Sequence, residues 1–524
     1  MKYIKQASMI LLCSMGLLLS NMVTAKPLTS KPNLIIIVAD DLGYADLSFL
    51  EQAPADVKTL RTPAIDRLAR EGTFFSNAYA TAPICSPSRC GLITGRYQQR
   101  WGNYWYGQGG LPSEETTLPQ ALKRLGYHSK KIGKTHLNGG PARHPLDHGF
   151  DEFLGFQSHT WDYIRLSQKD LDAYRQRAEG KPLGMLYVGP LQKDRGEPVS
   201  YENEFTTDVF TDEAIEFIRR DRDNKPFYIE LEYNAVHMPT YVTHETWARK
   251  VGIDPTPWDR NAEAWTFPYW DPRKESWGSW HKQWGHLGKV DPLGRKRYLS
   301  HLIAMDSGIG QILDALDKTD QRDNTIIVFV SDNGGTINTY SNNTPLRGYK
   351  YMFGEGGIRV PMLISFPGRL PQGQTCNALV SAMDIYPTVM ELAGRAGHSK
   401  LDGKTLVPLL TGQQTGDNHA ALCWARGPKN WTIRKGPWKL GHQIGWNHLN
   451  FKIVDGLCVR DTDDSLYPDG TVLFNLKDDI GETTNLADRH PEIVEELTEL
   501  YEEWHREMVR DKASRPKKPK RKQK

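Results

Sequence analysis

Two unbroken apolar runs constrain the fold of this chain more than any other feature. Residues 34–39 read Leu-Ile-Ile-Ile-Val-Ala and residues 325–330 read Thr-Ile-Ile-Val-Phe-Val, without the alternation expected of a half-exposed strand. Such runs are typical of parallel strands that helices cover on both faces. Segments with helical spacing of apolar residues, such as 62–69 and 298–316, lie between the two runs. The pattern predicts an α/β fold with a large, mostly parallel central sheet between helices.

Both runs end in side chains that carry oxygen. Asp40 and Asp41 follow the first run, and Asp332 and Asn333 follow the second. Open α/β sheets bind ligands at the carboxyl ends of their strands. Either pair could simply cap a turn, but two buried strands that deliver such pairs at the same end favour a metal site. Hard oxygen ligands select calcium or magnesium over zinc or copper, and flexible coordination favours calcium.

A short segment with a leading cysteine forms the second candidate site. Residues 85–96 read Cys-Ser-Pro-Ser-Arg-Cys-Gly-Leu-Ile-Thr-Gly-Arg. Because Pro87 suits the first position of a helix, we expect Cys85 or Ser86 at the cap. A helix start binds anions and favours the charged form of a nearby thiol. From these residues alone, Cys85 is either a nucleophile in an anion site or an inert thiol.

The same segment resembles the signature of the type I sulfatases, which have an alkaline-phosphatase-like fold. In that family a maturation enzyme oxidises the leading cysteine to formylglycine, and the hydrate of this aldehyde is the nucleophile. The resemblance implies that Cys85 is converted and contacts the metal, and that Arg89 holds the hydrate in place. The matching positions are Cys85, Pro87, Ser88, Arg89, Leu92, Thr94, Gly95 and Arg96.

Further blocks follow in the family's order, so that the resemblance covers roughly residues 34–361. The motif Gly-Lys-Thr-His at 133–136 lacks the glycine frame of a phosphate-binding loop and matches the family's Lys-x-His pair. The resemblance implies that Lys134 and Lys350 bind sulfate. It also implies that His136 takes a proton from the hydrate and that His237, after the apolar run 227–233, protonates the leaving sugar oxygen.

Composition divides the chain into four parts. Residues 1–25 have two lysines, a short apolar run and small residues before the expected cleavage site, which is typical of a secretory signal peptide. We expect a catalytic domain at 26–415 and a smaller C-terminal domain of antiparallel strands and a helix at 416–510. The protein is therefore expected to be exported, either periplasmic or secreted, with no stable membrane insertion and no nucleic-acid partner.

The remaining part, residues 511–524, is a basic tail with eight Lys or Arg against one Asp, and we expect it to be disordered. It accounts for the formal net charge of +3, because the body of the chain is mildly acidic. The tail is either a solvated terminus or a source of loose attraction to a polyanion.

Tryptophan is concentrated in residues 241–295. Irregular spacing with Pro and Gly predicts a long loop or insertion there. Its aromatic faces, beside Arg260, Arg273, Lys274 and Lys282, would suit a sulfated sugar, although a hydrophobic cluster under the loop explains them nearly as well. Seven of the 15 tryptophans lie in this segment: Trp247, Trp258, Trp265, Trp270, Trp277, Trp280 and Trp284.

Cleavage of the leader would leave an odd number of cysteines, and conversion of Cys85 would leave Cys90, Cys376, Cys423 and Cys458 to pair or stay free. The function expected overall is hydrolysis of sulfate monoesters on a sulfated polysaccharide or oligosaccharide, since the motifs look most like those of bacterial sulfatases that act on algal galactans such as carrageenan. Two alternatives stay open: a phosphodiester or phosphonate monoester hydrolase on the same fold, and an exported sulfated-glycan-binding protein whose Cys85 is never modified.

Overall fold

A computed structural model describes residues 31–515 apart from several segments, and of strands 451–454 and 457–460 it describes the backbone alone. The segments outside the description are 106, 109, 138–143, 158–162, 164–190, 198, 200, 202–203, 239, 241, 256–292, 445–450, 455–456 and 461–469. The predicted signal peptide therefore lies outside the described residues.

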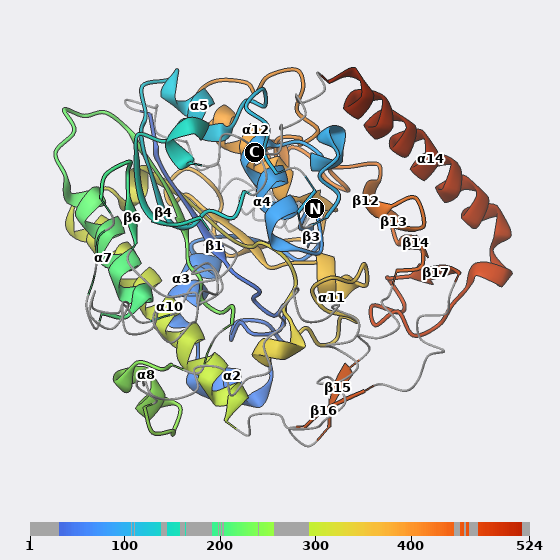
Figure 1. Cartoon of the computed structure of the whole chain (residues 1–524), viewed down its shortest axis with the longest axis horizontal. Helices are drawn as coiled ribbons and strands as arrows, with labels where there is room; N and C mark the ends of the chain where they lie inside the picture. The colour runs from blue at the N-terminus through green and yellow to red at the C-terminus, as the bar shows by residue number, and fades with distance from the viewer. Residues whose placement is uncertain are drawn as a thin grey trace, which may run out of the picture.

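A nine-stranded sheet forms the centre of the molecule (Figure 1). Neighbouring strands pair in parallel except where β9 and β6 run against their neighbours. The predicted mostly parallel central sheet is thus confirmed. In sheet order the strands are β10 (Gln374–Cys376), β2 (Gly72–Phe75), β9 (Met362–Ser365), β8 (Thr325–Ser331), β1 (Asn33–Ala39), β7 (Phe227–Glu232), β4 (His128–Lys134), β5 (Glu152–Phe156) and β6 (Gln192–Lys193).

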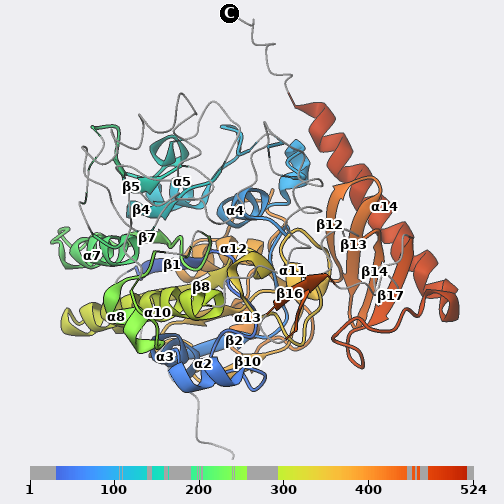
Figure 2. The same cartoon turned by 60° about the horizontal axis from the view of Figure 1, so that its bottom comes forward.

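Helices cover both faces of this sheet (Figure 2). Strand β1 shows why its run is unbroken: Ile35 and Ile37 pack on one face, and Leu34, Ile36 and Val38 pack on the other. The first face is covered by α2 (Ala55–Leu60), α3 (Pro63–Arg70), α7 (Thr206–Arg219), α8 (Glu245–Lys250) and α10 (Gly294–Lys318). The second is covered by α4 (Cys85–Thr94), α5 (Leu118–Lys123), α12 (Ile385–Leu392) and α13 (Val407–Leu410).

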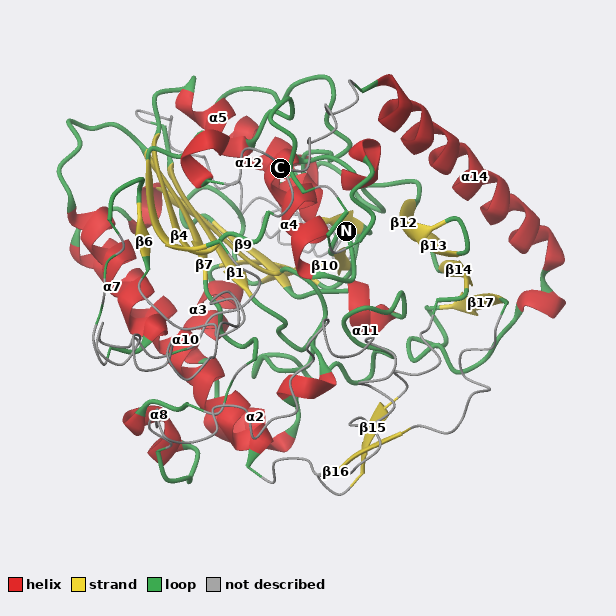
Figure 3. Cartoon of the chain, in the orientation of Figure 1, coloured by secondary structure: helices red, strands yellow, loops and turns green. Residues whose placement is uncertain are grey.

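A second, antiparallel sheet lies beside the large domain, with a long helix across it (Figure 3). Its strands are β12 (Leu422–Gly427), β13 (Asn430–Lys435), β14 (Trp438–His442) and β17 (Thr471–Asn475), and the helix is α14 (Pro491–Ser514). The ring of Trp431 stacks on Tyr501 of this helix with centroids 4.0 Å apart. This arrangement confirms the predicted C-terminal unit of antiparallel strands and a helix.

Short elements connect these layers. β3 (Ala78–Tyr79) pairs with β11 (Val380–Ser381), and β15 (Phe451–Val454) pairs with β16 (Leu457–Arg460). α11 (Glu355–Ile358) is a single turn, and the 3-10 turns are η1 (Gln98–Trp101), η2 (Pro145–His148), η4 (Arg322–Asn324), η5 (Ile337–Thr339), η6 (Ala382–Asp384) and η8 (Ala487–Arg489).

Two of the predicted boundaries need correction. Helix α14 continues to Ser514, so the first four residues of the expected disordered tail are helical, and Arg515 pairs with Glu115 of the large domain. Ion pairs from the helix and from Arg515 to the large domain hold this stretch in place, whereas residues 516–524 lie outside the described residues.

The tryptophan-rich segment is also not a loop throughout, because Trp247 belongs to helix α8 and packs against the core. The other six tryptophans, together with Arg260, Arg273, Lys274 and Lys282, lie outside the described residues.

Candidate active site

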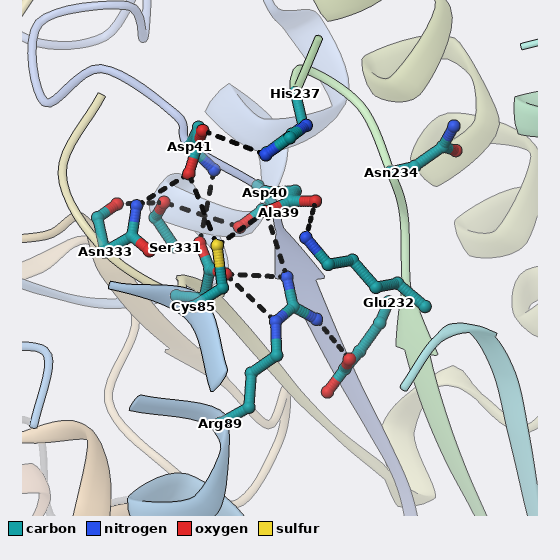
Figure 4. A network of polar contacts seen from close by, with 12 residues as sticks. Ala39, Asp40, Asp41, Cys85, Arg89, Glu232, Asn234, His237, Ser331 and Asn333 are labelled. Atoms are coloured by element: carbon teal, nitrogen blue, oxygen red, sulfur yellow. Dashed lines mark hydrogen bonds and ion pairs between the residues drawn. The ribbon is translucent and has the colours of Figure 1, made fainter. Parts of the chain in front are cut away.

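The carboxyl ends of β1 and β8 bring the two predicted ligand pairs together (Figure 4). The strands pair in parallel with Ala39 beside Ser331, so the residues that follow leave the sheet at one place. The backbone N–H of Asp41 donates to Asp332 Oδ1 at 3.2 Å, and Asn333 Nδ2 donates to Asp41 Oδ1 at 2.7 Å. Asp41 has a φ of 60°, in the left-handed region that aspartate tolerates better than most residues.

Helix α4 places Cys85 against these carboxylates. The helix begins at Cys85 itself, with Ile84 at the N-cap, so the prediction of Cys85 or Ser86 at the cap is wrong by one or two residues. Pro87 still lies in the first turn, where a missing N–H breaks no helical hydrogen bond. The Cys85 thiol donates to Asp40 Oδ1 at 3.7 Å and to Asp41 Oδ1 at 3.8 Å.

This thiol is not an activated nucleophile. Burial raises the pKa of Cys85 well above its ordinary value, although the ammonium groups of Lys134 and Lys350 lower it. The expectation that the helix start would favour the charged thiol is therefore wrong, because loss of hydration outweighs the nearby positive charge. The unmodified thiol is neutral and a poor nucleophile.

Three buried cations from three separate parts of the chain converge on these carboxylates. Lys134, at the end of β4, lies 2.6 Å from Asp40 Oδ2. Lys350 lies 2.7 Å from Asp41 Oδ1. Arg89, one turn along α4 from Cys85, donates to Asp332 Oδ2 from Nη2 at 2.7 Å.

These contacts set the charge state of the site. Burial acts to raise the pKa of the Asp40 and Asp41 carboxyls, but Lys134 beside Asp40 and Lys350 beside Asp41 hold both pKa values below the ordinary range. The carboxylates are therefore ionised, and the cations that the sequence assigns to sulfate are held within hydrogen-bond distance of them.

The two predicted histidines also lie at this end of the sheet. His237 Nδ1 lies 2.7 Å from the carbonyl oxygen of Met238, to which it can donate, and Nε2 lies 3.5 Å from Asp41 Oδ2. Burial lowers the pKa of His237, although Asp40 and Asp41 raise it. His136 follows Lys134 by two residues, is buried, and has a φ of 42°.

The donor set suits a hard divalent cation. Ligand atoms of Asp40, Asp41, Cys85 and His237 lie within 4.8 Å of one another. Asn333 Oδ1 is buried and has no hydrogen-bond partner among the residues that the structure describes, which is costly unless a cation or another donor meets it. These oxygens fit calcium or magnesium. The sequence did not predict His237 among the possible metal ligands. Asp332, which the sequence did predict, lies beside these ligands, and its Oδ2 accepts a hydrogen bond from Arg89.

A buried charge network beneath the site was missed from the sequence. Glu232, the last residue of β7, accepts a hydrogen bond from Arg89 Nη1, and Lys131 lies 2.6 Å from Glu230 and 2.7 Å from Glu232. Burial raises the pKa of Glu232 to about 7, although Arg89 and Lys131 lower it. The sequence signal for this network was the alternation of glutamates with apolar residues along β7, which has a buried strand on each side. A glutamate in such a strand needs a charged or hydrogen-bonding partner, so this pattern indicates buried ion pairs.

The cysteines show no disulfide in the described part of the chain. Cys85, Cys90, Cys376 and Cys423 are free thiols, and the side chain of Cys458 lies outside the described residues. Among the described helices, none combines the length and the apolar composition that crossing a membrane requires.

Comparison with known proteins identifies the family of this site. The sulfatase family model matches residues 32–395. N-acetylgalactosamine-6-sulfatase of Canis lupus familiaris is 30% identical over 438 residues, which cover 80% of this chain and 72% of the relative. The uncharacterized sulfatase YdeN of Escherichia coli is 28% identical, with 76% and 70% covered.

A solved structure agrees with these matches. The crystal structure of Ps i-CgsB in complex with k-i-k-neocarrahexaose superimposes with a TM-score of 0.70 and 30% identity, covering 91% of this chain and 93% of that chain. The family match spans the central sheet, the Cys85 helix and the strand ends that carry the acidic cluster. The chain therefore belongs to the sulfatase family and is a sulfuric ester hydrolase.

Proposed function

We propose that this enzyme removes sulfate from a sulfated polysaccharide or oligosaccharide, an algal galactan such as carrageenan, with formylglycine at position 85 and a divalent metal. The observation that carries the proposal is the position of Cys85 Sγ, within 3.8 Å of carboxylate oxygens of both Asp40 and Asp41 at the start of a helix. The likeness to Ps i-CgsB, solved with k-i-k-neocarrahexaose, supports a galactan substrate.

The metal would be calcium, or else magnesium, held by Asp40, Asp41, Asp332 and Asn333 beside the residue at position 85. When bound, it supplies Lewis-acid polarisation of a sulfate oxygen and favours the ionised form of an oxygen nucleophile. The carboxylates also hold Lys134 and Lys350 against this cluster. Both ammonium groups then neutralise charge that shifts onto the sulfuryl oxygens during the reaction.

Formylglycine supplies a hydrated aldehyde, in which one hydroxyl can attack sulfur and the second can later expel the product. Arg89, held between Asp332 and Glu232, orients this residue. His237 gives a proton to the sugar oxygen as the bond between sulfur and that oxygen breaks. His136 takes a proton from the remaining hydroxyl at position 85, so that sulfate leaves and the aldehyde returns. A thiolate would offer no such second hydroxyl.

His237 must gain a proton before it can act as an acid. Its pKa is lowered by burial, so the free enzyme holds it neutral at neutral pH. A sulfate ester brings negative charge next to the ring and favours the protonated form. His237 therefore takes up a proton from solvent when the substrate binds, which suits an acid that acts only on a bound ester.

Mass analysis of tryptic peptides tests the modification. Trypsin cleaves after Arg89, so Cys85 and Cys90 fall on separate peptides, and Cys90 serves as an internal control in the same helix. In protein from its native host we expect an aldehyde at position 85 and a thiol at position 90. An unmodified thiol at position 85 would instead favour a glycan-binding protein without sulfatase turnover.

A panel of defined sulfated oligosaccharides tests the substrate. We expect sulfate release, followed by ion chromatography, from carrageenan oligosaccharides and not from glycosaminoglycan fragments. Release from glycosaminoglycan fragments alone contradicts the galactan assignment. Hydrolysis of a phosphodiester or phosphonate monoester in preference to every sulfate ester contradicts sulfate as the main substrate.

Export is part of the same proposal. A chain with the predicted signal peptide at 1–25 meets sulfated polysaccharide outside the cytoplasm, and a formylglycine-generating enzyme must act on Cys85 before folding buries it. Fractionation of the native host followed by N-terminal sequencing should place the mature protein in the periplasm or the medium, starting near residue 26. Recovery from the cytoplasm with the leader intact contradicts export.

A further inference from the structure

A line of aromatic and cationic side chains runs from the candidate active site to the C-terminal sheet. Lys350 Nζ lies 5.5 Å from the ring centroid of Tyr351, and this ring lies 6.2 Å from that of Trp105. The guanidinium of Arg426 lies 4.4 Å from the Trp105 centroid. Since Lys350 also contacts Asp41, these contacts form a continuous path away from the site where the sulfate ester would react.

The packing of β12 explains how Arg426 reaches this position. β12 is the edge strand of the small sheet that lies next to the large domain (Figure 2). Trp424 Nε1 donates to the carbonyl oxygen of Ala80 at 2.7 Å, just before the Cys85 helix. Arg426 lies two residues further along the strand, at a β-bulge where the pairing of β12 with β13 shifts between Ala425 and Gly427, and its guanidinium lies over the Trp105 ring.

The large domain holds the two rings from its own side. The Tyr351 N–H donates to the carbonyl oxygen of Pro83 at 2.7 Å, two residues before Cys85. Trp105 lies in the loop that follows η1, and η1 itself packs against helix α14. The three side chains thus come from three separate segments that meet beside the start of α4.

Exposure separates this cluster from the cation–aromatic contact of Arg434 and Tyr79 at the same junction. Arg434 lies over Tyr79 with its guanidinium 5.1 Å from the ring centroid, but both side chains are buried. Trp105, Tyr351 and Arg426 are each only partly buried, so a ligand can reach them. Burial lowers the pKa of Arg426 to about 10, because the guanidinium loses part of its hydration.

We propose that Trp105, Tyr351 and Arg426 form a subsite for the sugar ring next to the one that loses its sulfate, and that this neighbouring ring carries its own anionic group. Aromatic faces stack on the apolar side of a sugar ring, and a guanidinium binds sulfate with two parallel hydrogen bonds. The subsite deepens the proposed function and depends on it. It makes the enzyme selective for a polyanionic chain over an isolated sulfate monoester.

The test compares two oligosaccharides of equal length that differ only in a sulfate on the ring next to the reacting one. Arg426→Ala should lower the ratio of kcat/KM between the disulfated and the monosulfated substrate about tenfold, since a hydrogen bond to a charged group is worth roughly that factor. The loss should appear in KM, because the contact is the same in the ground state and the transition state. Arg426→Lys should restore part of the ratio.

Lys429→Ala is the matched control, because Lys429 lies in the same hairpin, carries the same charge and is exposed. It should leave the ratio unchanged, and thermal unfolding of each variant reports any damage to the fold. An Arg426→Ala enzyme that keeps the wild-type ratio, or loses both substrates equally, overturns the subsite while the sulfatase function stands. A wild-type enzyme that releases sulfate from neither substrate contradicts the proposed function, and the subsite with it.

Discussion

Charge balance decides how individual residues of the site behave. Asp40, Asp41 and Asp332 are buried side by side, and each has a cation from another element within hydrogen-bond distance. A buried charge without such a partner costs several kcal/mol, so the lysines and the arginine stabilise the folded site as well as preparing it for an anion. Structural and chemical roles therefore overlap at these residues, and only matched variants separate them.

Lys350 provides the sharpest test of this overlap. Lys350→Met should lower kcat for sulfate release by about 10²–10³-fold, the usual cost of losing a group that stabilises developing charge. The protein should remain soluble, as shown by circular dichroism. Lys130→Met is the control, since Lys130 is a buried lysine of β4 that pairs with Glu152 and Glu213 outside the site. Near-normal turnover in the Lys350 variant would refute the assignment.

Glu232 is a positioning residue rather than a catalytic one, because it touches Arg89 and no ligand of the expected metal. Glu232→Gln replaces the carboxyl that accepts the hydrogen bond from Arg89 and should lower kcat about tenfold with little change in KM. Glu230→Gln is the control, because Glu230 shares Lys131 with Glu232 but contacts Tyr228 in place of Arg89. Equal losses in both variants, measured by steady-state kinetics, would assign the effect to general destabilisation of the network.

The sequence alone predicts the carboxylate and amide residues of the site, for a physical reason. Asp40, Asp41, Asp332 and Asn333 follow directly on buried strands, so local pattern and the geometry of parallel sheets are enough to bring them together. Glu232 could not be assigned in the same way. Its role depends on Arg89, which is 143 positions away along the chain and reaches it through a side-chain contact.

At the scale of elements, helix α3 begins without a cap of its own. Its N-cap residue Thr62 makes no side-chain capping bond to the helix. Asp306 of helix α10 takes that part instead, accepting hydrogen bonds from Ala64 N–H at 3.3 Å and Ile65 N–H at 2.9 Å. The sequence predicts both helices from their own periodicity, but a cap supplied by another helix leaves no local signal.

The burial of Asp306 should make the stability of the protein depend on pH. Burial raises the pKa of Asp306 to about 7, although the two N–H groups lower it. A raised pKa means that the folded state binds the proton more tightly, so this contribution is complete below about pH 4 and disappears as pH rises through 7. Thermal unfolding should show a smaller loss of stability between pH 5 and 8 in Asp306→Asn than in the wild type. An identical loss would place the pH dependence elsewhere.

At the scale of the whole molecule, one buried ion network joins the two domains. Lys439 of β14 lies 2.9 Å from Glu355 of α11 and 2.8 Å from Glu482, and all three side chains are buried. The proposed subsite includes residues from both domains, so its geometry depends on this junction. The packing of one domain on the other could not be predicted from sequence, because the contacts between them join residues 84 and 127 positions apart.

Removing Lys439 tests the junction directly. Lys439→Met removes the cation that Glu355 and Glu482 share and leaves only Arg359 and Arg434 near Glu355, which should lower the free energy of unfolding by about 3–5 kcal/mol. A second substitution, Glu482→Gln, removes one of the two charges and should recover part of the loss, so the double variant should unfold at a higher temperature than Lys439→Met alone. Additive losses in that cycle would show that the residues do not act as one network. Because the geometry of the subsite depends on this junction, the ratio of kcat/KM between the disulfated and the monosulfated substrate should fall in Lys439→Met and recover with the second substitution.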